Sequence, residues 1–152
     1  MGAPYWDQYA RGAMLGLTRG TTPAHITRAT LEGIAFQVYD ILKAMEHDTK
    51  RTSPEMRVDG GAVANNFLMQ FQSDICRETV VRPKILETTA LGAAYLAGLA
   101  TGYWRDTEEL RQQWSIDQEF TPIDTEEHVN IMLHKWHRAV ERARAWEELG
   151  EE

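Results

Sequence analysis

Two adjacent glycines, Gly60 and Gly61, are the feature that most constrains the fold of this chain. They follow a short β-like run over residues 55–59 and lead into an amphipathic segment that begins near Asn65. Glycine has no Cβ atom, so the backbone at such a turn can approach a flat ligand closely. The first turn of the following helix adds unpaired N–H groups and the positive end of the helix dipole. A strand, a bare turn and a helix N-terminus in this order favour a nucleotide as ligand.

The same residues also fit an ordinary strand-to-helix turn, in which Asn65 or Asn66 serves only as the N-cap of the helix. The stretch is not a P-loop, because it lacks the Lys-Ser/Thr ending, and it lacks the three-glycine spacing of a dinucleotide-binding turn. No Lys or Arg lies between Val58 and Asn66. A polyphosphate bound here would therefore need a metal ion or another part of the protein to neutralise its charge.

Length and composition limit the class of protein. The 152 residues suit one domain and carry a net charge of −7, from 16 Lys and Arg against 23 Asp and Glu. Without a basic cluster the chain has no source for the phosphate-backbone attraction that dominates nucleic-acid binding, so we expect no nucleic-acid partner. The single cysteine, Cys76, excludes an intramolecular disulfide and fits a reducing compartment. The sequence has no membrane-length apolar run and no signal-peptide pattern, which predicts a cytoplasmic protein.

The apolar periodicity predicts strands that alternate with helices, which is typical of an α/β layered domain. Three weak strands are too few for a stable sheet, so we expect the other strands to belong to a longer protein. Residues 2–7 agree, because aromatic and turn residues of the kind that usually pack inside a protein stand at the start of the chain. In chain order, the predicted elements are a glycine-interrupted strand over 11–17, a helix from Thr22-Pro23 to about residue 47, a strand over 55–59, a helix over 65–76, a strand over 79–81, a helix over 88–100, a short polar helix over 106–113, an extended segment over 115–120 and a helix over 125–149.

Three of these helices have apolar faces that we expect to be buried. The predicted buried residues are Ile26, Thr30, Ile34, Val38, Ile41, Leu42 and Met45 in the first helix, Phe67, Leu68, Phe71 and Ile75 in the second, and Val129, Met132, Trp136, Val140, Ala143 and Trp146 in the last. The helix over 88–100 has an unusually small face, which would allow close approach by another element.

Two spaced segments carry a resemblance to a known family. Residues 12–17 and, seven residues later, residues 25–32 fit the signature of the C-terminal domain of the FGGY family of carbohydrate kinases. Four further segments resemble the glycerol kinases of that family more than its xylulose or gluconate kinases: residues 2–7, 17–20, 59–74 and 89–98. The resemblance is close from residue 2 to about residue 104 and looser from there to about residue 148.

The resemblance implies a fold and a function. The fold would be an α/β, ribonuclease H-like (actin-like ATPase) C-terminal domain, incomplete at its N-terminus, with a mixed sheet flanked by helices. Residues 1–152 would form the C-terminal nucleotide-binding domain, and the N-terminal substrate domain would be absent. The full-length enzyme would be a homo-oligomer that transfers the γ-phosphate of ATP to glycerol with Mg²⁺, giving sn-glycerol 3-phosphate and ADP. The alternatives are a non-catalytic interaction or oligomerisation module and an FGGY kinase for another polyol or sugar.

The family resemblance also implies which residues bind the nucleotide. Gly61 and Asn65 would contact the adenine-ribose part of ATP, with Gly60 and Ala62 as loop neighbours. The chemistry agrees, because Gly61 lets a purine approach the backbone and the Asn65 amide can both donate and accept hydrogen bonds. Asn65 could cap the helix and bind the ligand at once. The general base, the phosphate loop and the glycerol site would lie in the N-terminal domain, so we expect no catalytic residue and no activity in this chain alone.

Two further groups have more than one interpretation. Asp59, beside the glycines, could contact a Mg²⁺-bound water or could anchor the turn through its own backbone bonds. The three histidines of the last predicted helix, at positions 128, 134 and 137, could suggest a metal site, since residues 134 and 137 share a helix face, but this predicted surface helix supplies no fixed third ligand. We therefore expect solvent-exposed histidines and no metal ligand.

Overall fold

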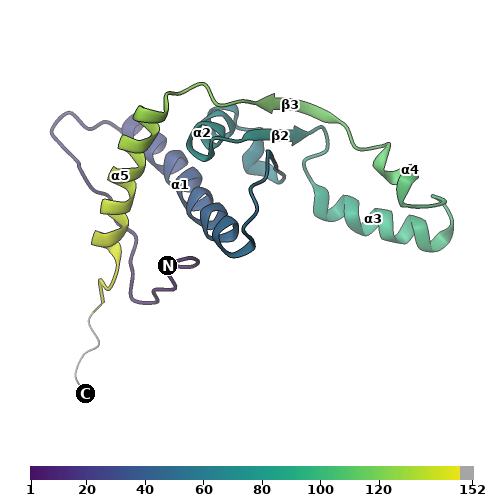
Figure 1. The fold of residues 1–152 in the computed structure, drawn as a ribbon, viewed down its shortest axis with the longest axis horizontal. Helices are drawn as coiled ribbons and strands as arrows, with labels where there is room; N and C mark the ends of the chain where they lie inside the picture. Colours follow the sequence, from purple (N-terminus) through teal and green to yellow (C-terminus); the bar gives the residue numbers. More distant parts are fainter. Residues whose placement is uncertain (148–152) are drawn as a thin grey trace, which may run out of the picture. The chain divides into compact units, whose positions relative to one another are not determined.

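The computed structural model describes residues 1–147. The chain forms two compact units. The helical unit comprises residues 1–52, 74–76 and 123–147, and the sheet unit comprises residues 53–73 and 77–122. In chain order (Figure 1), the elements are α1 (Pro23–Thr49), β1 (Glu55–Arg57), the 3₁₀ turn η1 (Gly61–Ala64), α2 (Asn66–Cys76), β2 (Thr79–Pro83), α3 (Thr88–Thr101), α4 (Thr107–Arg111), β3 (Ile116–Phe120) and α5 (Glu126–Ala143).

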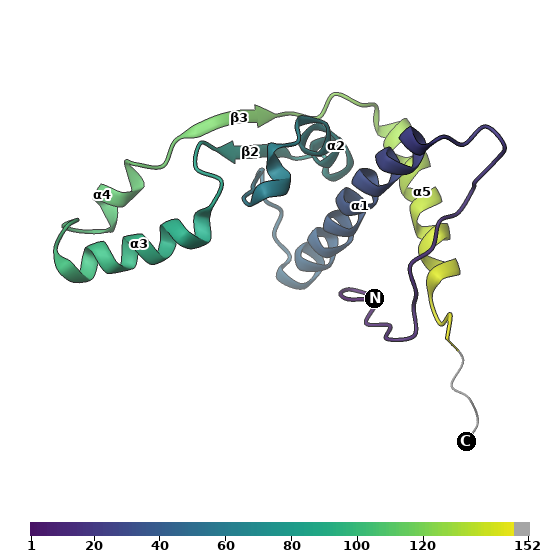
Figure 2. The ribbon, with the colours of Figure 1, turned by 180° about the vertical axis from the view of Figure 1, so that it is seen from behind.

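The sheet is mixed and has the order β1-β2-β3. β1 and β2 are parallel, with Met56 opposite Val80, and η1 and α2 form the crossover that a parallel pair requires. β3 is antiparallel to β2, with Val80 opposite Phe120, and the two strands run side by side in Figures 1 and 2. The mixed sheet with helices confirms the predicted α/β class, and the extended segment at residues 115–120 is its third strand.

The predicted strand at residues 11–17 is wrong. Residues 10–18 have no regular structure, and every residue from 11 to 20 is exposed. The Arg11 N–H donates to the Ala143 carbonyl at 3.2 Å, which joins this segment to the end of α5 and not to the sheet. A β-like composition becomes a strand only where a neighbouring strand supplies the ladder, and the residues that the structure describes place none beside this segment.

The beginning of α1 is as predicted, while its packing differs from the prediction. Thr22 is the N-cap and Pro23 the first helical residue, where its fixed φ fits and its missing N–H costs nothing. The buried residues of α1 are Ala35, Phe36 and Asp40. Five residues of the predicted buried face are exposed: Ile26, Thr30, Ile34, Ile41 and Met45.

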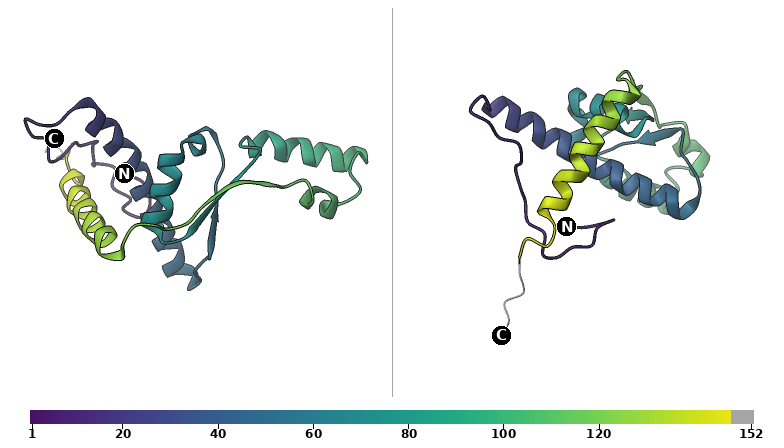
Figure 3. Two further views of the ribbon diagram at one scale, coloured as in Figure 1. Left: turned by 90° about the horizontal axis from the view of Figure 1, so that it is seen from above. Right: turned by 60° about the vertical axis from the view of Figure 1, so that its left-hand side comes forward.

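The helical unit is centred on the contact between α1 and α5. The Phe36 ring of α1 and the Trp136 ring of α5 stack with centroids 5.2 Å apart. The right-hand view of Figure 3 shows α5 running across α1. The carboxylate of Asp40 is buried beside them and accepts hydrogen bonds from the Tyr5 hydroxyl at 2.9 Å and from Trp136 Nε1 at 2.7 Å. Burial, together with this bond to Asp40, raises the pKa of Tyr5 above its usual value. These contacts join the N-terminal residues to both helices.

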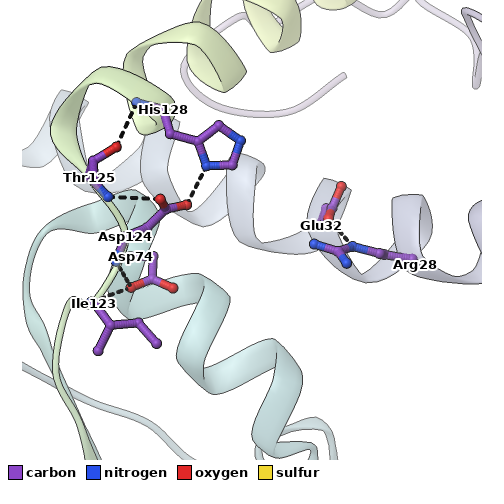
Figure 4. A network of polar contacts seen from close by, with 7 residues as sticks. All are labelled: Arg28, Glu32, Asp74, Ile123, Asp124, Thr125 and His128. Carbon is purple, nitrogen blue, oxygen red and sulfur yellow. Dashed lines mark hydrogen bonds and ion pairs between the residues drawn. The ribbon is translucent and has the colours of Figure 1, made fainter.

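A polar network fixes the start of α5 (Figure 4). Asp74 Oδ1 accepts from the backbone N–H of Ile123 at 2.7 Å and of Asp124 at 3.2 Å. Thr125 caps the helix by accepting from the His128 N–H, and Glu126 and Glu127 face the positive end of the dipole. Figure 4 also shows an ion pair within α1, in which Arg28 Nε lies 2.6 Å from Glu32 Oε1.

The predicted buried stripe of α5 is partly right. Val129, Val140 and Ala143 are buried, as is Leu133, which was not among the predicted residues. Trp146 is 65% exposed because the helix ends at Ala143, so the helical period no longer applies to it. The predicted helix end at residue 149 lies outside the described residues.

The sheet unit has a core of aliphatic and aromatic side chains. Val80 and Val81 of β2 are almost fully buried. The other buried apolar residues of the unit are Val63, Leu68, Met69, Phe71 and Phe120. Phe67, which was predicted to be buried, is 37% exposed.

The small face of α3 leaves room for an aromatic ring. The Trp104 side chain occupies the space that a Cβ at Gly98 would need, and Trp104 also meets Tyr95 edge-on with centroids 5.2 Å apart. Gly98 is therefore required by packing within this part of the chain. Across the described residues, none of the helices combines the length and the apolar character that a membrane crossing demands.

Candidate functional site

The turn at Gly60 is fixed by backbone hydrogen bonds on both sides. The Val58 N–H donates to the Val81 carbonyl at 3.2 Å, and the Gly60 N–H donates to the Leu86 carbonyl at 2.8 Å. Gly60 has φ +85° and ψ 171°, a backbone conformation that is essentially confined to glycine. The first glycine of the pair is therefore required by the backbone of the turn itself.

The second glycine has no such requirement. Gly61 does not have a positive φ, and a Cβ added to it would meet no heavy atom within 4 Å among the residues that the structure describes. Gly61 and Ala62 are exposed on the outer side of η1, while Val63 on its inner side is buried. Neither packing nor backbone conformation explains a glycine at this position. The space above Gly61 is open to a ligand.

Asn65 is the N-cap of α2, as one of the two predicted roles requires. Its Oδ1 accepts from the Leu68 N–H at 3.1 Å, and its own N–H donates to the Ala62 carbonyl at 3.2 Å. The cap uses the oxygen of the side-chain amide. A ligand could still accept from the NH₂ group of the same side chain, so both predicted roles are compatible with this geometry.

Asp59 anchors the turn through its side chain. Its carboxylate accepts a hydrogen bond from the hydroxyl of Thr88, the first residue of α3. The end of β1, the glycine turn and the start of α3 are thereby linked within the sheet unit.

A buried arginine that the sequence analysis did not identify lies against this turn. Arg82 is in β2, and its Nη1 donates to the Val63 carbonyl at 3.0 Å and to Asn66 Oδ1 at 2.8 Å. The residues next to the glycines in the sequence do not indicate this arginine. The signal that could have indicated it is a charged residue inside an apolar strand, because a buried charge needs partners.

The three histidines of α5 are exposed, as predicted. Two of them have carboxylate neighbours, since His128 Nδ1 lies 2.6 Å from Asp124 Oδ2 and His137 Nε2 lies 3.3 Å from Asp40 Oδ1. Among residues 1–147, no group of three or more His, Cys, Asp or Glu side chains is placed to hold a metal ion.

The fold and the turn together define a domain of the actin-like ATPase, ribonuclease H-like class. Residues 1–101 match the model of the C-terminal domain of the FGGY family of carbohydrate kinases. The chain belongs to the FGGY family, which confirms the resemblance drawn from its motifs.

Sequence relatives and solved structures agree with this assignment. The chain is 65% identical over 148 residues to a glycerol kinase of Parabacteroides distasonis, a match that covers 97% of this chain and 30% of the relative. It is 63% identical to a glycerol kinase of Symbiobacterium thermophilum, covering 96% of this chain and 29% of the relative. The chain thus spans about 30% of the length of the curated relatives it matches.

Among solved structures, Plasmodium falciparum glycerol kinase with ADP matches at TM-score 0.81 and 35% identity, over 97% of this chain and 29% of that chain. A ligand-bound xylulose kinase from Lactobacillus acidophilus matches at TM-score 0.69 and 28% identity, over 93% of this chain and 30% of that chain.

Proposed function

We propose that residues 1–152 form the C-terminal, nucleotide-binding domain of an ATP-dependent glycerol kinase. Relatives named glycerol kinase are 55–65% identical to the chain over almost its whole length. Among the solved kinases, glycerol kinase has higher identity and TM-score than xylulose kinase, which favours glycerol over another sugar substrate. The observation that carries the nucleotide site is Gly61, a glycine that the fold does not need, at an exposed turn before a helix N-terminus.

In this proposal the adenine-ribose part of ATP lies against η1. Gly61 leaves room for the purine, and Gly60 and Ala62 flank it. The NH₂ group of Asn65 donates to the ligand while its Oδ1 caps α2. A structure of a glycerol kinase relative contains ADP, which is consistent with a nucleotide at this domain.

The complete enzyme would transfer the γ-phosphate of ATP to a glycerol hydroxyl, giving sn-glycerol 3-phosphate and ADP. Phosphoryl transfer relies on positioning and on Mg²⁺ to neutralise the phosphates. The resemblance to the glycerol kinases implies that the general base, the phosphate loop and the glycerol site lie in the N-terminal domain. We therefore place the general base, the glycerol site and the metal contacts in the rest of a cytoplasmic, homo-oligomeric enzyme, and we expect this chain alone to bind nucleotide weakly.

The test is an assay of ADP release by the complete kinase with glycerol, other polyols, xylulose and gluconate. Glycerol-dependent turnover is expected. Turnover with another compound only would make this an FGGY kinase of different specificity, and no turnover at all would favour an interaction module. The isolated chain should show no glycerol-dependent ADP release, and turnover by it would contradict the assignment of the base to another domain.

The site itself is tested with Gly61→Val in the complete kinase. A branched side chain would fill the space above the turn, so KM for ATP should rise while KM for glycerol changes little. Ala100→Val, at an exposed position of α3, adds bulk elsewhere in the sheet unit and should change neither constant. Equal losses for both substrates would make Gly61 a structural glycine.

A further inference from the structure

We infer that Arg82 is a positioning residue that fixes the nucleotide-binding turn and the start of α2. The inference rests on the proposed function, because it assumes that ATP binds at Gly61 and Asn65. Arg82 itself is buried, with its side chain 11% exposed, so it acts through the residues that it holds.

The Arg82 guanidinium is held on two sides. On the turn side, Nη1 donates to the Val63 carbonyl at 3.0 Å and to Asn66 Oδ1 at 2.8 Å. On the β3 side, Nε and Nη2 both lie 2.8 Å from Asp117 Oδ2, and Nη2 donates to Gln118 Oε1 at 3.1 Å. One planar group thereby joins the turn to the sheet.

The two turn-side contacts lie on either side of Asn65 in the sequence. Val63 is in η1, and Asn66 is the first residue of α2, so Ala64 and Asn65 lie between two points that the same nitrogen holds. The direction of the Asn65 side chain depends on where α2 begins. Arg82 therefore sets the geometry of the Asn65 amide without contacting the nucleotide.

The chemistry requires an arginine at this position. A guanidinium has five N–H donors in a rigid fork, whereas an ammonium is a single point charge on a flexible stem and cannot reach both sides at these angles. Asp117 compensates the positive charge, and the Phe120 ring lies 5.3 Å from the guanidinium carbon. Because its charge is buried and paired in this way, the Arg82 guanidinium holds the turn and does not bind a phosphate.

The experiment compares two variants that each remove one hydrogen-bond acceptor from the guanidinium. Asn66→Ala removes a turn-side contact, and Gln118→Ala removes a β3-side contact. In the complete kinase we expect Asn66→Ala to raise KM for ATP about threefold to tenfold, because the start of α2 loses its hydrogen bond to Arg82. The values of kcat and of KM for glycerol should be nearly unchanged. Gln118→Ala should leave KM for ATP within about twofold.

Arg82→Lys completes the test. It should raise KM for ATP at least as much as Asn66→Ala, and the double variant Arg82→Lys with Asn66→Ala should add little to the single effects, because both residues act through one contact. Additive effects would show that Asn66 contacts the nucleotide directly and would overturn the inference. Equal effects of Asn66→Ala and Gln118→Ala on both substrates would make Arg82 merely structural, which also overturns it.

The assay separates this inference from the proposed function on which it rests. If Gly61→Val leaves KM for ATP unchanged, the nucleotide binds elsewhere and the proposed site fails. If Gly61→Val raises KM for ATP and Asn66→Ala does not, the site stands and the role of Arg82 fails. Should Arg82→Lys not fold, Asn66→Ala and Gln118→Ala still decide between these outcomes.

Discussion

Residues 10–18 of the helical unit and residues 58–65 of the sheet unit are both glycine-bearing connections, but they are held in different ways. The turn at residues 58–65 has backbone hydrogen bonds to Val81 and Leu86 and a buried guanidinium on its inner side. Residues 10–18 have a backbone bond from Arg11 to Ala143 and one from the Thr18 N–H to Thr21 Oγ1 at 2.9 Å.

The two segments also differ in what they expose. The apolar side chains of residues 10–18, Met14, Leu15 and Leu17, are at least half exposed, and they line an open hollow of about 840 Å³ with α1 and α5. In the turn of the sheet unit, Val63 is only 5% exposed. Glycine in a sequence indicates that the backbone has a special conformation there, while the surrounding buried groups decide how firmly that conformation is held.

Truncation of a buried side chain should give the largest difference in stability between the sheet unit and residues 10–18. Phe71→Ala, at a position only 6% exposed in the sheet unit, should lower the free energy of unfolding by about 3–5 kcal/mol. Leu15→Ala in residues 10–18 should change it by within about 0.5 kcal/mol. Urea unfolding of the chain measures both. A large loss with Leu15→Ala would show that residues 10–18 are packed as firmly as the sheet unit.

A matched pair of glycines gives the next largest effect. Gly60 and Gly16 both have φ +85°, and at neither would an added Cβ meet an atom within 4 Å in the described chain. Gly60→Ala should cost about 1–3 kcal/mol of stability, because the flanking hydrogen bonds prevent the turn from relaxing. Gly16→Ala should cost less, because residues 10–18 can change conformation. Thermal unfolding of the two variants measures both losses of stability. Equal losses would show that the two segments are held equally firmly.

These differences show which parts of the fold the sequence could predict. The Thr22-Pro23 helix start and the Gly60-Gly61 turn depend on neighbouring residues and were predicted correctly, and the Asn65 cap is one of the two alternatives given for the start of α2. The strand at residues 11–17 was wrong because strand formation depends on a partner far along the chain. The buried face of α1 was wrong because periodicity shows that a helix has an apolar face and does not show which element covers it.

The residues of the candidate site also differ in whether nearby sequence indicates them. Gly61 and Asn65 were proposed from local pattern and family resemblance, and their contact with the nucleotide stays a prediction. Arg82 was missed because its contact with Val63 spans 19 residues and its pairing with Asp117 spans 35. Only the unusual position of a charge within the apolar run of β2 points to it in the sequence.

The attachment of the N-terminal residues should depend on pH through Asp7. Backbone N–H donors, first that of Ala145 at 2.8 Å, lower the pKa of Asp7 below its usual 3.8. A lowered pKa stabilises the folded state at pH values above 3.8, and this contribution is lost as the pH falls through the folded-state pKa. Asp7→Asn should therefore reduce the melting temperature at neutral pH and make no difference in strong acid. A constant difference across that range would mean that Asp7 acts through packing and not through its charge.

At Asn65 we expect a small effect on stability together with the sharpest effect on function. An N-cap needs only a side-chain acceptor, so Asn65→Asp should change stability by about 1 kcal/mol or less. The nucleotide needs the amide donor as well, and a carboxylate would repel the phosphates, so KM for ATP of the complete kinase should rise severalfold. Asn65→Ser is the matched control, because serine keeps the cap and removes the donor without adding charge; its KM for ATP should rise less than that of Asn65→Asp. If both variants leave KM for ATP and the melting temperature unchanged, Asn65 does not contact the nucleotide, and the assignment of this residue by family resemblance must be withdrawn.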